Sequence, residues 1–114
     1  DKAGCVAIYE AARMAKELPG EYGLTLVFSS MEETGSQGAK TVSEMLLPTH
    51  AIVVDVSFGT HPGVPESRTG KMKNGPMIGY APILDQGMSK ELEETAKRLR
   101  ALFGKSGPAK EPDR

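Results

Sequence analysis

The sequence predicts an α/β fold built on parallel strands, and three features point to it. Residues 24–28 and 51–56 form two short, almost continuously apolar runs of the kind found in strands buried on both faces. A stretch with helical character, about residues 39–47, lies between them. A strand, a crossover helix and a second buried strand form a βαβ unit. We therefore expect the two runs to pair in parallel within one sheet.

The other elements are predicted from the spacing of apolar residues and from the positions of Pro and Gly, which end helices and form loops. Over residues 4–18, apolar residues recur at helical spacing, with charged residues on the opposite side, and Pro19 ends the pattern. Residues 58–74 are rich in Gly, Pro, Ser and Lys and predict a long loop. Residues 76–83 predict a further short strand.

A second amphipathic helix is expected near the end of the chain. Ser89 is the predicted N-cap, and Glu91, Glu93 and Glu94 are well placed near the positive end of the helix dipole. The helix is expected to end at Gly104. Its predicted buried face consists of Leu92, Ala96, Leu99 and Phe103. Residues 1–104 are thus expected to belong to one folded domain, and the polar, Pro-rich residues 105–114 to form a disordered tail.

Composition narrows the class of protein. The chain has 114 residues, of which 39% are hydrophobic and 25% charged, which suits one modest globular domain. A net charge of −1 gives no reason to expect nucleic acid or an anionic membrane as a partner. Cys5 is the single cysteine, so no internal disulfide or thiolate metal cluster is possible. The absence of a membrane span or signal peptide and the lone thiol favour a cytoplasmic protein.

Acidic residues follow both predicted strands. The pair Glu32 and Glu33 comes after the first, and Asp55 lies in the last turn of the second. The carboxyl ends of parallel strands meet at one sheet edge, where ligands bind. One glutamate could bind a metal while its neighbour acts as a base. Alternatively, Asp55 forms a salt bridge or caps the following loop, and the two glutamates belong to a solvated turn.

The motifs resemble one family of metal-dependent enzymes. Asp1 to Cys5, then Glu32-Glu33-Thr34-Gly35 with Gly38-Ala39, then Val54-Asp55-Val56, are similar in order and spacing to the tetrahedral (TET-type) glutamyl and deblocking aminopeptidases. Residues 62–66 and 71–76 resemble the loop and strand entry that follow. The likeness covers roughly residues 1–97. It implies a phosphorylase/hydrolase-like α/β fold and a site with two divalent metal ions, zinc or cobalt.

The resemblance also assigns roles to individual residues. Glu32 matches the family's general base, Glu33 matches a ligand of one metal, and Asp55 matches a ligand of the other. The family pattern has an acid that bridges the metals, then Asp or Asn, then a basic residue. Lys2 is the basic residue here, so Asp1 matches the second acid and the bridging acid precedes it. The implied partners are a peptide substrate and further copies of the chain in a homo-oligomer.

Two ligands of the family site have no match in this sequence. The family uses one His upstream and another far downstream, whereas His61 lies in a loop that corresponds to neither. His50 precedes a predicted strand and is also unmatched. We therefore expect the 114-residue chain alone to be inactive and to bind metal weakly.

Other functions remain open at this point. Paired carboxylates also serve glycoside hydrolases such as endoglucanases, although those enzymes usually present aromatic platforms to sugars. This chain has no Trp and only three Tyr and three Phe. A third possibility is a non-catalytic fragment or an assembly module. Dependence on a divalent metal would separate the aminopeptidase from the glycosidase.

Overall fold

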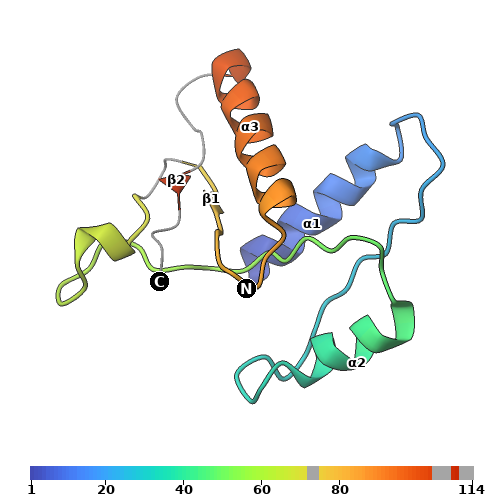
Figure 1. Ribbon diagram of the computed structural model, residues 1–114, viewed down its shortest axis with the longest axis horizontal. Helices are drawn as coiled ribbons and strands as arrows, with labels where there is room; N and C mark the ends of the chain where they lie inside the picture. Colours follow the sequence, from blue (N-terminus) through green and yellow to red (C-terminus); the bar gives the residue numbers. More distant parts are fainter. Residues whose placement is uncertain (72–74, 104–108, 111–114) are drawn as a thin grey trace. The chain divides into compact units, whose positions relative to one another are not determined.

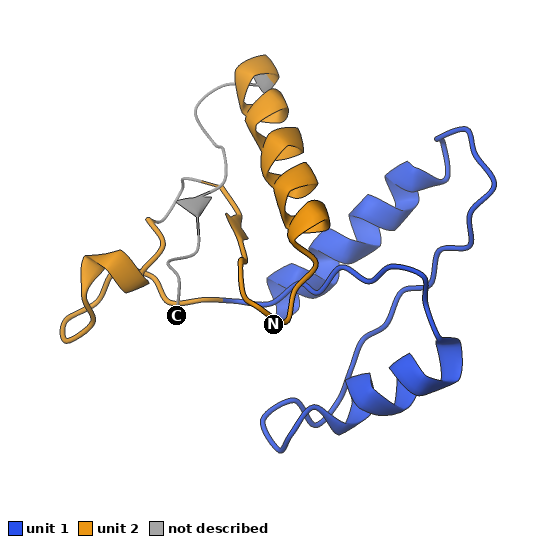
Figure 2. Ribbon diagram, viewed as in Figure 1, with its two compact units in different colours: residues 1–56 blue, residues 57–114 orange. Residues whose placement is uncertain are grey.

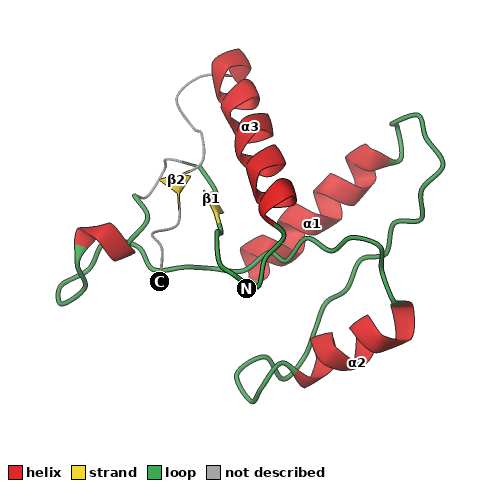
Figure 3. Ribbon diagram, in the orientation of Figure 1, coloured by secondary structure: helices red, strands yellow, loops and turns green. Residues whose placement is uncertain are grey.

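The computed structural model describes residues 1–71, 75–103 and 109–110 (Figure 1). The chain divides into two compact units, residues 1–56 and residues 57–114, and each is described by itself (Figure 2). The first unit contains helices α1 (Lys2–Ala15) and α2 (Gln37–Leu46). The second contains the 3-10 helix η1 (Glu66–Arg68), strand β1 (Met77–Ile78), helix α3 (Gln86–Phe103) and strand β2 (Ala109–Lys110). Loops and turns connect them (Figure 3).

Helix α1 confirms the first predicted helix. Asp1 is its N-cap, and one carboxylate oxygen accepts a hydrogen bond from the Gly4 backbone N–H at 2.8 Å. The helix ends at Ala15, three residues before the predicted end. The next residues continue with turn-like hydrogen bonds, from Leu18 N–H to Ala15 O at 3.1 Å for example. The Tyr22 hydroxyl donates a second hydrogen bond to the same carbonyl at 2.6 Å, at the end of the helix where carbonyl groups lose their intrahelical donors.

Helix α2 confirms the second predicted helix within two residues at each end. It begins after Ser36 and ends before Leu47, and both of these flanking residues have left-handed backbone angles, with φ of 57° and 43°. The left-handed residue at the carboxyl end is a common way for a helix to stop. Pro48 follows and cannot continue the helix.

The predicted strand pair is not formed. Residues 24–28 and 51–56 have no regular secondary structure in the described part of the chain, so the expected pairing of two strands is not seen there, and the α/β fold stays a prediction. A parallel strand needs hydrogen-bonded neighbours and cover on both faces. The described residues leave the side chains of Ile52 and Val53 63% and 86% exposed, so this cover is missing.

The second unit contains the β-ladders that the described residues form. Strand β1 pairs in parallel with β2, Met77 opposite Ala109 and Ile78 opposite Lys110. An isolated parallel bridge joins Gly59 to Gly70 within the predicted loop. The predicted strand over residues 76–83 is therefore reduced to two residues. Helix α3 packs against β1.

Helix α3 begins earlier than predicted. The residue that caps it is Asp85, whose carboxylate accepts a hydrogen bond from Met88 N–H at 2.8 Å. The prediction of Ser89 as N-cap is wrong, because Ser89 lies inside the helix with only 6% of its surface exposed. Asp caps a helix as well as Ser does, so residue type alone does not distinguish Asp85 from Ser89.

The predicted buried face of α3 is confirmed only in part. Leu92 and Ala96 are half-buried, whereas Leu99 is 50% exposed. The Phe103 side chain and Gly104 lie outside the described residues. Of the tail predicted to be disordered, residues 109–110 form β2, and the others also lie outside the described residues.

The described residues include no buried hydrophobic side chain. Large apolar side chains of both units are exposed instead, among them Val6 at 62%, Phe28 at 57% and Ile83 at 92%. Hydrophobic burial is the main favourable term in folding, so these surfaces are candidates for cover by other protein. None of the described helices is long and apolar enough to cross a membrane.

Candidate active site

The two glutamates lie in a tightly wound loop that leads into α2. The Glu32 carbonyl oxygen accepts hydrogen bonds from the backbone N–H groups of Gly35 and Ser36, both at 3.0 Å. The Thr34 hydroxyl donates to the Met31 carbonyl at 3.3 Å. These bonds wind the chain around the carbonyl of Glu32 and leave its side chain free to project.

Left-handed backbone angles make this winding possible. Met31 has φ 56°, Gly35 has φ 112° and Ser36 has φ 57°. Non-glycine residues adopt this region at a cost of about 1–2 kcal/mol each. Such conformations persist only where the surroundings over-determine them, and they cluster at functional sites.

The loop is closed at its base by a close backbone contact. Gly38 N–H donates to the Ser30 carbonyl oxygen at 3.1 Å. A Cβ atom at Gly38 would lie 2.7 Å from both the backbone N and the backbone O of Ser30. Only glycine fits at this point without movement of the backbone. We call residues 30–38, closed in this way, the glutamate loop.

The predicted site residues are all exposed, and the structure does not gather them. Glu32, Glu33 and Asp55 each have exposed side chains. One Asp55 carboxylate oxygen accepts a hydrogen bond from the N–H of the next residue, Val56, at 2.7 Å. Within the described ranges, no three His, Cys, Asp or Glu side chains lie together in a way that could hold a metal ion.

The fit to a metal pair is therefore incomplete. Carboxylate oxygens are suitable ligands for zinc, and Glu33 and Asp55 have this chemistry. A catalytic zinc usually takes three protein ligands, and the described residues do not bring three together. The assignment of Glu33 and Asp55 as ligands stays a prediction.

Asp1 and Asp55 belong to segments that approach each other within the first unit. The Asp1 carboxylate caps α1 through Gly4 N–H. Gly4 is buried, and a Cβ atom there would lie 3.4 Å from a methyl carbon of Val54, the residue before Asp55. The start of α1 thus lies beside the segment that carries Asp55. The resemblance matched Asp55 to a metal ligand and Asp1 to the second acid of a motif, but it gave no sign of this contact between their neighbours.

His61 has a local partner. Its Nδ1 atom lies 2.9 Å from the carbonyl oxygen of Pro62, a hydrogen bond that requires the proton on Nδ1. Its ring lies beside Phe58, with 6.1 Å between the ring centroids. Both contacts suit an ordinary loop histidine.

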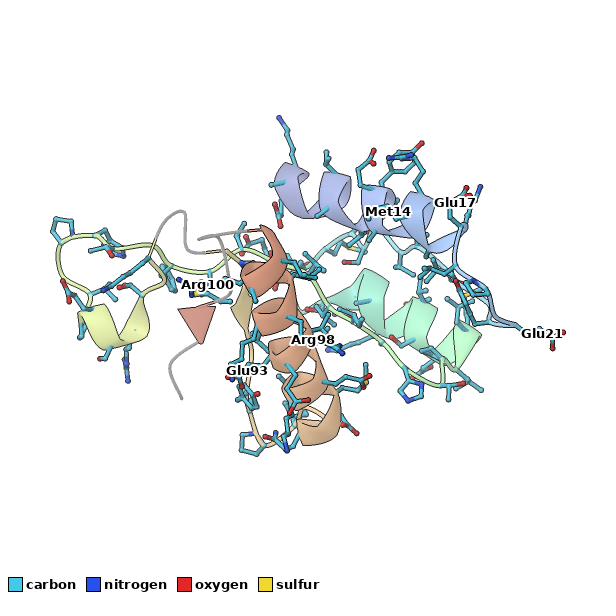
Figure 4. All side chains as sticks on the ribbon, turned by 90° about the horizontal axis from the view of Figure 1, so that it is seen from above. Met14, Glu17, Glu21, Glu93, Arg98 and Arg100 are labelled. Atoms are coloured by element: carbon cyan, nitrogen blue, oxygen red, sulfur yellow. The ribbon has the colours of Figure 1, made fainter. Side chains whose placement is uncertain are left out.

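Sequence reasoning missed one polar cluster. Glu93 was expected to favour the start of α3 by charge alone, but its side chain is largely buried on the side of the helix toward β1 (Figure 4). One carboxylate oxygen accepts a hydrogen bond from the Tyr80 hydroxyl at 2.5 Å, and the other lies 2.7 Å from Lys97 Nζ. The hydrogen bond to Glu93, then burial and the negative charges of Glu93 and Glu94, raise the pKa of Tyr80 to about 12.

The spacing of Glu93 and Lys97, four residues apart on one helix, could have indicated the ion pair. No sequence signal indicated the Tyr80 partner, because it depends on how α3 packs on the strand. The cluster ties α3 to the segment that follows β1.

The comparison with known families is decisive for classification. The profile of the M42 glutamyl aminopeptidase family matches residues 1–102. The chain belongs to this family. The TET-type resemblance read from the motifs is therefore confirmed, because the M42 family is the family of those enzymes.

This M42 chain is similar to two proteins that are named as aminopeptidases. A putative aminopeptidase of Acetivibrio thermocellus is 34% identical over 103 residues, which are 86% of this chain and 30% of the relative. A lysyl aminopeptidase of Pyrococcus furiosus is 29% identical over 98 residues, which are 86% of this chain and 28% of the relative. The M42 chain thus spans less than a third of the length of either relative. No solved structure matches it.

Proposed function

We propose that the protein carrying this M42 chain is a metal-dependent aminopeptidase that removes residues from the N-terminus of peptides. The family match over residues 1–102 carries this proposal. It is supported by the glutamate loop, which presents two adjacent carboxylates from a backbone held by three internal hydrogen bonds and a closed base. The names of the two relatives favour peptide hydrolysis over glycoside hydrolysis.

We assign Glu32 as the general base and Glu33 and Asp55 as ligands to two divalent metal ions, zinc or cobalt, which would supply Lewis-acid polarisation of the peptide carbonyl. Glu32 would accept the proton of the attacking water. Its exposed carboxylate, at the bend of a wound loop, is open to solvent and substrate. A parallel-sheet α/β domain, a homo-oligomeric assembly and a cytoplasmic location belong to the same proposal.

The test is to substitute the general base in the protein that carries this sequence. Glu32→Gln removes the base but keeps the shape of the side chain, so kcat should fall about 100- to 10,000-fold while KM changes little. Glu44→Gln is the matched control, because Glu44 is also exposed and lies on α2 just after the loop. An aminoacyl-chromophore substrate reports the rate.

Metal dependence is measured with the same substrate. Activity should disappear with a chelator and return with Zn²⁺ or Co²⁺. Activity that persists in the chelator, or Glu32→Gln turnover equal to that of Glu44→Gln, would overturn the assignment. A chelator-resistant glycosidase activity would favour the alternative reading of the carboxylate pair.

A further inference from the structure

The backbone shape of the glutamate loop depends on Gly38, a residue without a side chain. Gly38 is the second residue of α2, and its φ does not lie in the left-handed region, so backbone conformation alone does not require glycine there. The close approach of the Ser30 backbone does require glycine at this position. A Cβ atom would lie 2.7 Å from Ser30 N and Ser30 O, against the 3.4 Å at which ordinary contact begins. The shortfall is 3.4 − 2.7 = 0.7 Å.

The atoms that would clash with a side chain at Gly38 cannot move without a shift of the backbone. Two of the three nearest neighbours are backbone atoms, and the third, the Ser30 hydroxyl oxygen, is farther away at 3.1 Å. A methyl group at Gly38 must therefore push the two ends of the loop apart. This would also stretch the hydrogen bond from Gly38 N–H to Ser30 O.

We propose that Gly38, through its contact with the Ser30 backbone, is a positioning residue that sets where the loop presents Glu32 and Glu33. The inference rests on the proposed function, because the proposed function assigns Glu32 and Glu33 their roles. The argument is geometric. The printed hydrogen bonds hold the loop at its base, around the Glu32 carbonyl and between Thr34 and Met31, so a displacement of 0.7 Å at the base is carried into the bend.

A displacement of this size is large for catalysis. A misplacement of about 1 Å in reacting groups can cost about 100-fold in rate. Gly38→Ala should therefore lower kcat by about 100-fold, with KM changed little, because the displaced glutamates are assigned to the chemical step. A merely structural loss of folded protein would lower the active fraction and the helical signal instead.

A matched control lies in the same unit. A Cβ atom at Gly23 would meet nothing within 4 Å, and its φ does not lie in the left-handed region. Gly23→Ala should therefore leave kcat, KM and circular dichroism unchanged. The double variant Gly38→Ala with Ser30→Gly removes the Ser30 hydroxyl but keeps its backbone. If the backbone contact is the cause, this double variant stays as slow as Gly38→Ala.

The experiment measures steady-state kinetics and backbone amide exchange on the protein that carries this sequence. Exchange of the Gly35 and Ser36 amides, which bond to the Glu32 carbonyl, should accelerate in Gly38→Ala and not in Gly23→Ala. The inference is overturned if Gly38→Ala keeps wild-type kcat and amide exchange, or if Ser30→Gly restores both. If the unsubstituted protein shows no aminopeptidase activity, the proposed function fails, while the exchange comparison still decides whether Gly38 holds the loop.

Discussion

The contact between Tyr80 and Glu93 leads to a prediction about the ionisation of a single tyrosine. The hydroxyl lies 2.5 Å from the Glu93 carboxylate, and its hydrogen bond is the first cause that raises the pKa of Tyr80 from 10.0 to about 12. Glu93→Gln removes the negative charge and leaves an amide in its place. Because the first and third causes both come from Glu93, the pKa of Tyr80 should fall back toward 10.0.

The assay is a spectrophotometric titration of tyrosinate in matched pairs of proteins. Subtracting the curve of Tyr80→Phe from that of the wild type isolates the ionisation of Tyr80, whose midpoint should lie near pH 12. The same subtraction in the Glu93→Gln background should give a midpoint close to pH 10. The other two of the three tyrosines cancel in each difference.

The result also has a consequence for stability. The folded-state pKa of Tyr80 is above its unfolded value, so the neutral hydroxyl stabilises the fold fully below pH 10, and this contribution is lost as the pH rises through about 12. The stability difference between wild type and Tyr80→Phe should shrink over that interval. A wild-type difference titration centred at pH 10, or one unchanged by Glu93→Gln, would refute the reasoning.

Three further predictions concern caps, packing and metal. Asp85→Ala should destabilise α3 by about 0.5–2 kcal/mol, seen as a loss of helical circular dichroism, because Met88 N–H loses its acceptor; an unchanged spectrum would contradict this. Gly70→Ala should lower the free energy of unfolding by about 1–3 kcal/mol, because the new methyl group would overlap the Met77 sulfur and the Met77 side chain must turn away. Thermal unfolding measures this change, and a loss above this range would contradict the prediction. The 114-residue chain alone should bind Zn²⁺ or Co²⁺ weakly and show no turnover; tight binding of two metals with chelator-sensitive activity would point to His61 or a partner subunit as the missing ligand.

The sequence specified the helices well because their signals are local. The period of apolar residues over 4–18 and 39–47, and the Pro residues after them, predicted α1 and α2 within a few residues. The order and spacing of the acidic motifs were enough to place the chain in its family, which the match over residues 1–102 then showed. Each of these signals depends on neighbours in the chain rather than on contacts across the fold.

The strands and the site required tertiary structure. Residues 24–28 and 51–56 are apolar enough for buried strands, but a strand forms only where a neighbouring strand pairs with it, and the described residues show no such pairing for these two runs. For the same reason Glu33 and Asp55, though recognisable by motif, are not gathered into a metal site. Their convergence depends on a sheet edge that local sequence cannot build.

The close contacts were also decided in three dimensions. A glycine at position 38 is unremarkable in sequence, and only the approach of Ser30 shows why a side chain is excluded. Glu93 was expected to act on the helix dipole alone, whereas its carboxylate accepts a hydrogen bond from the Tyr80 hydroxyl. The sequence by itself determined the family, the helices and the carboxylates that could carry chemistry. The tertiary structure decided which groups meet, because a contact between distant residues depends on how the intervening chain is folded.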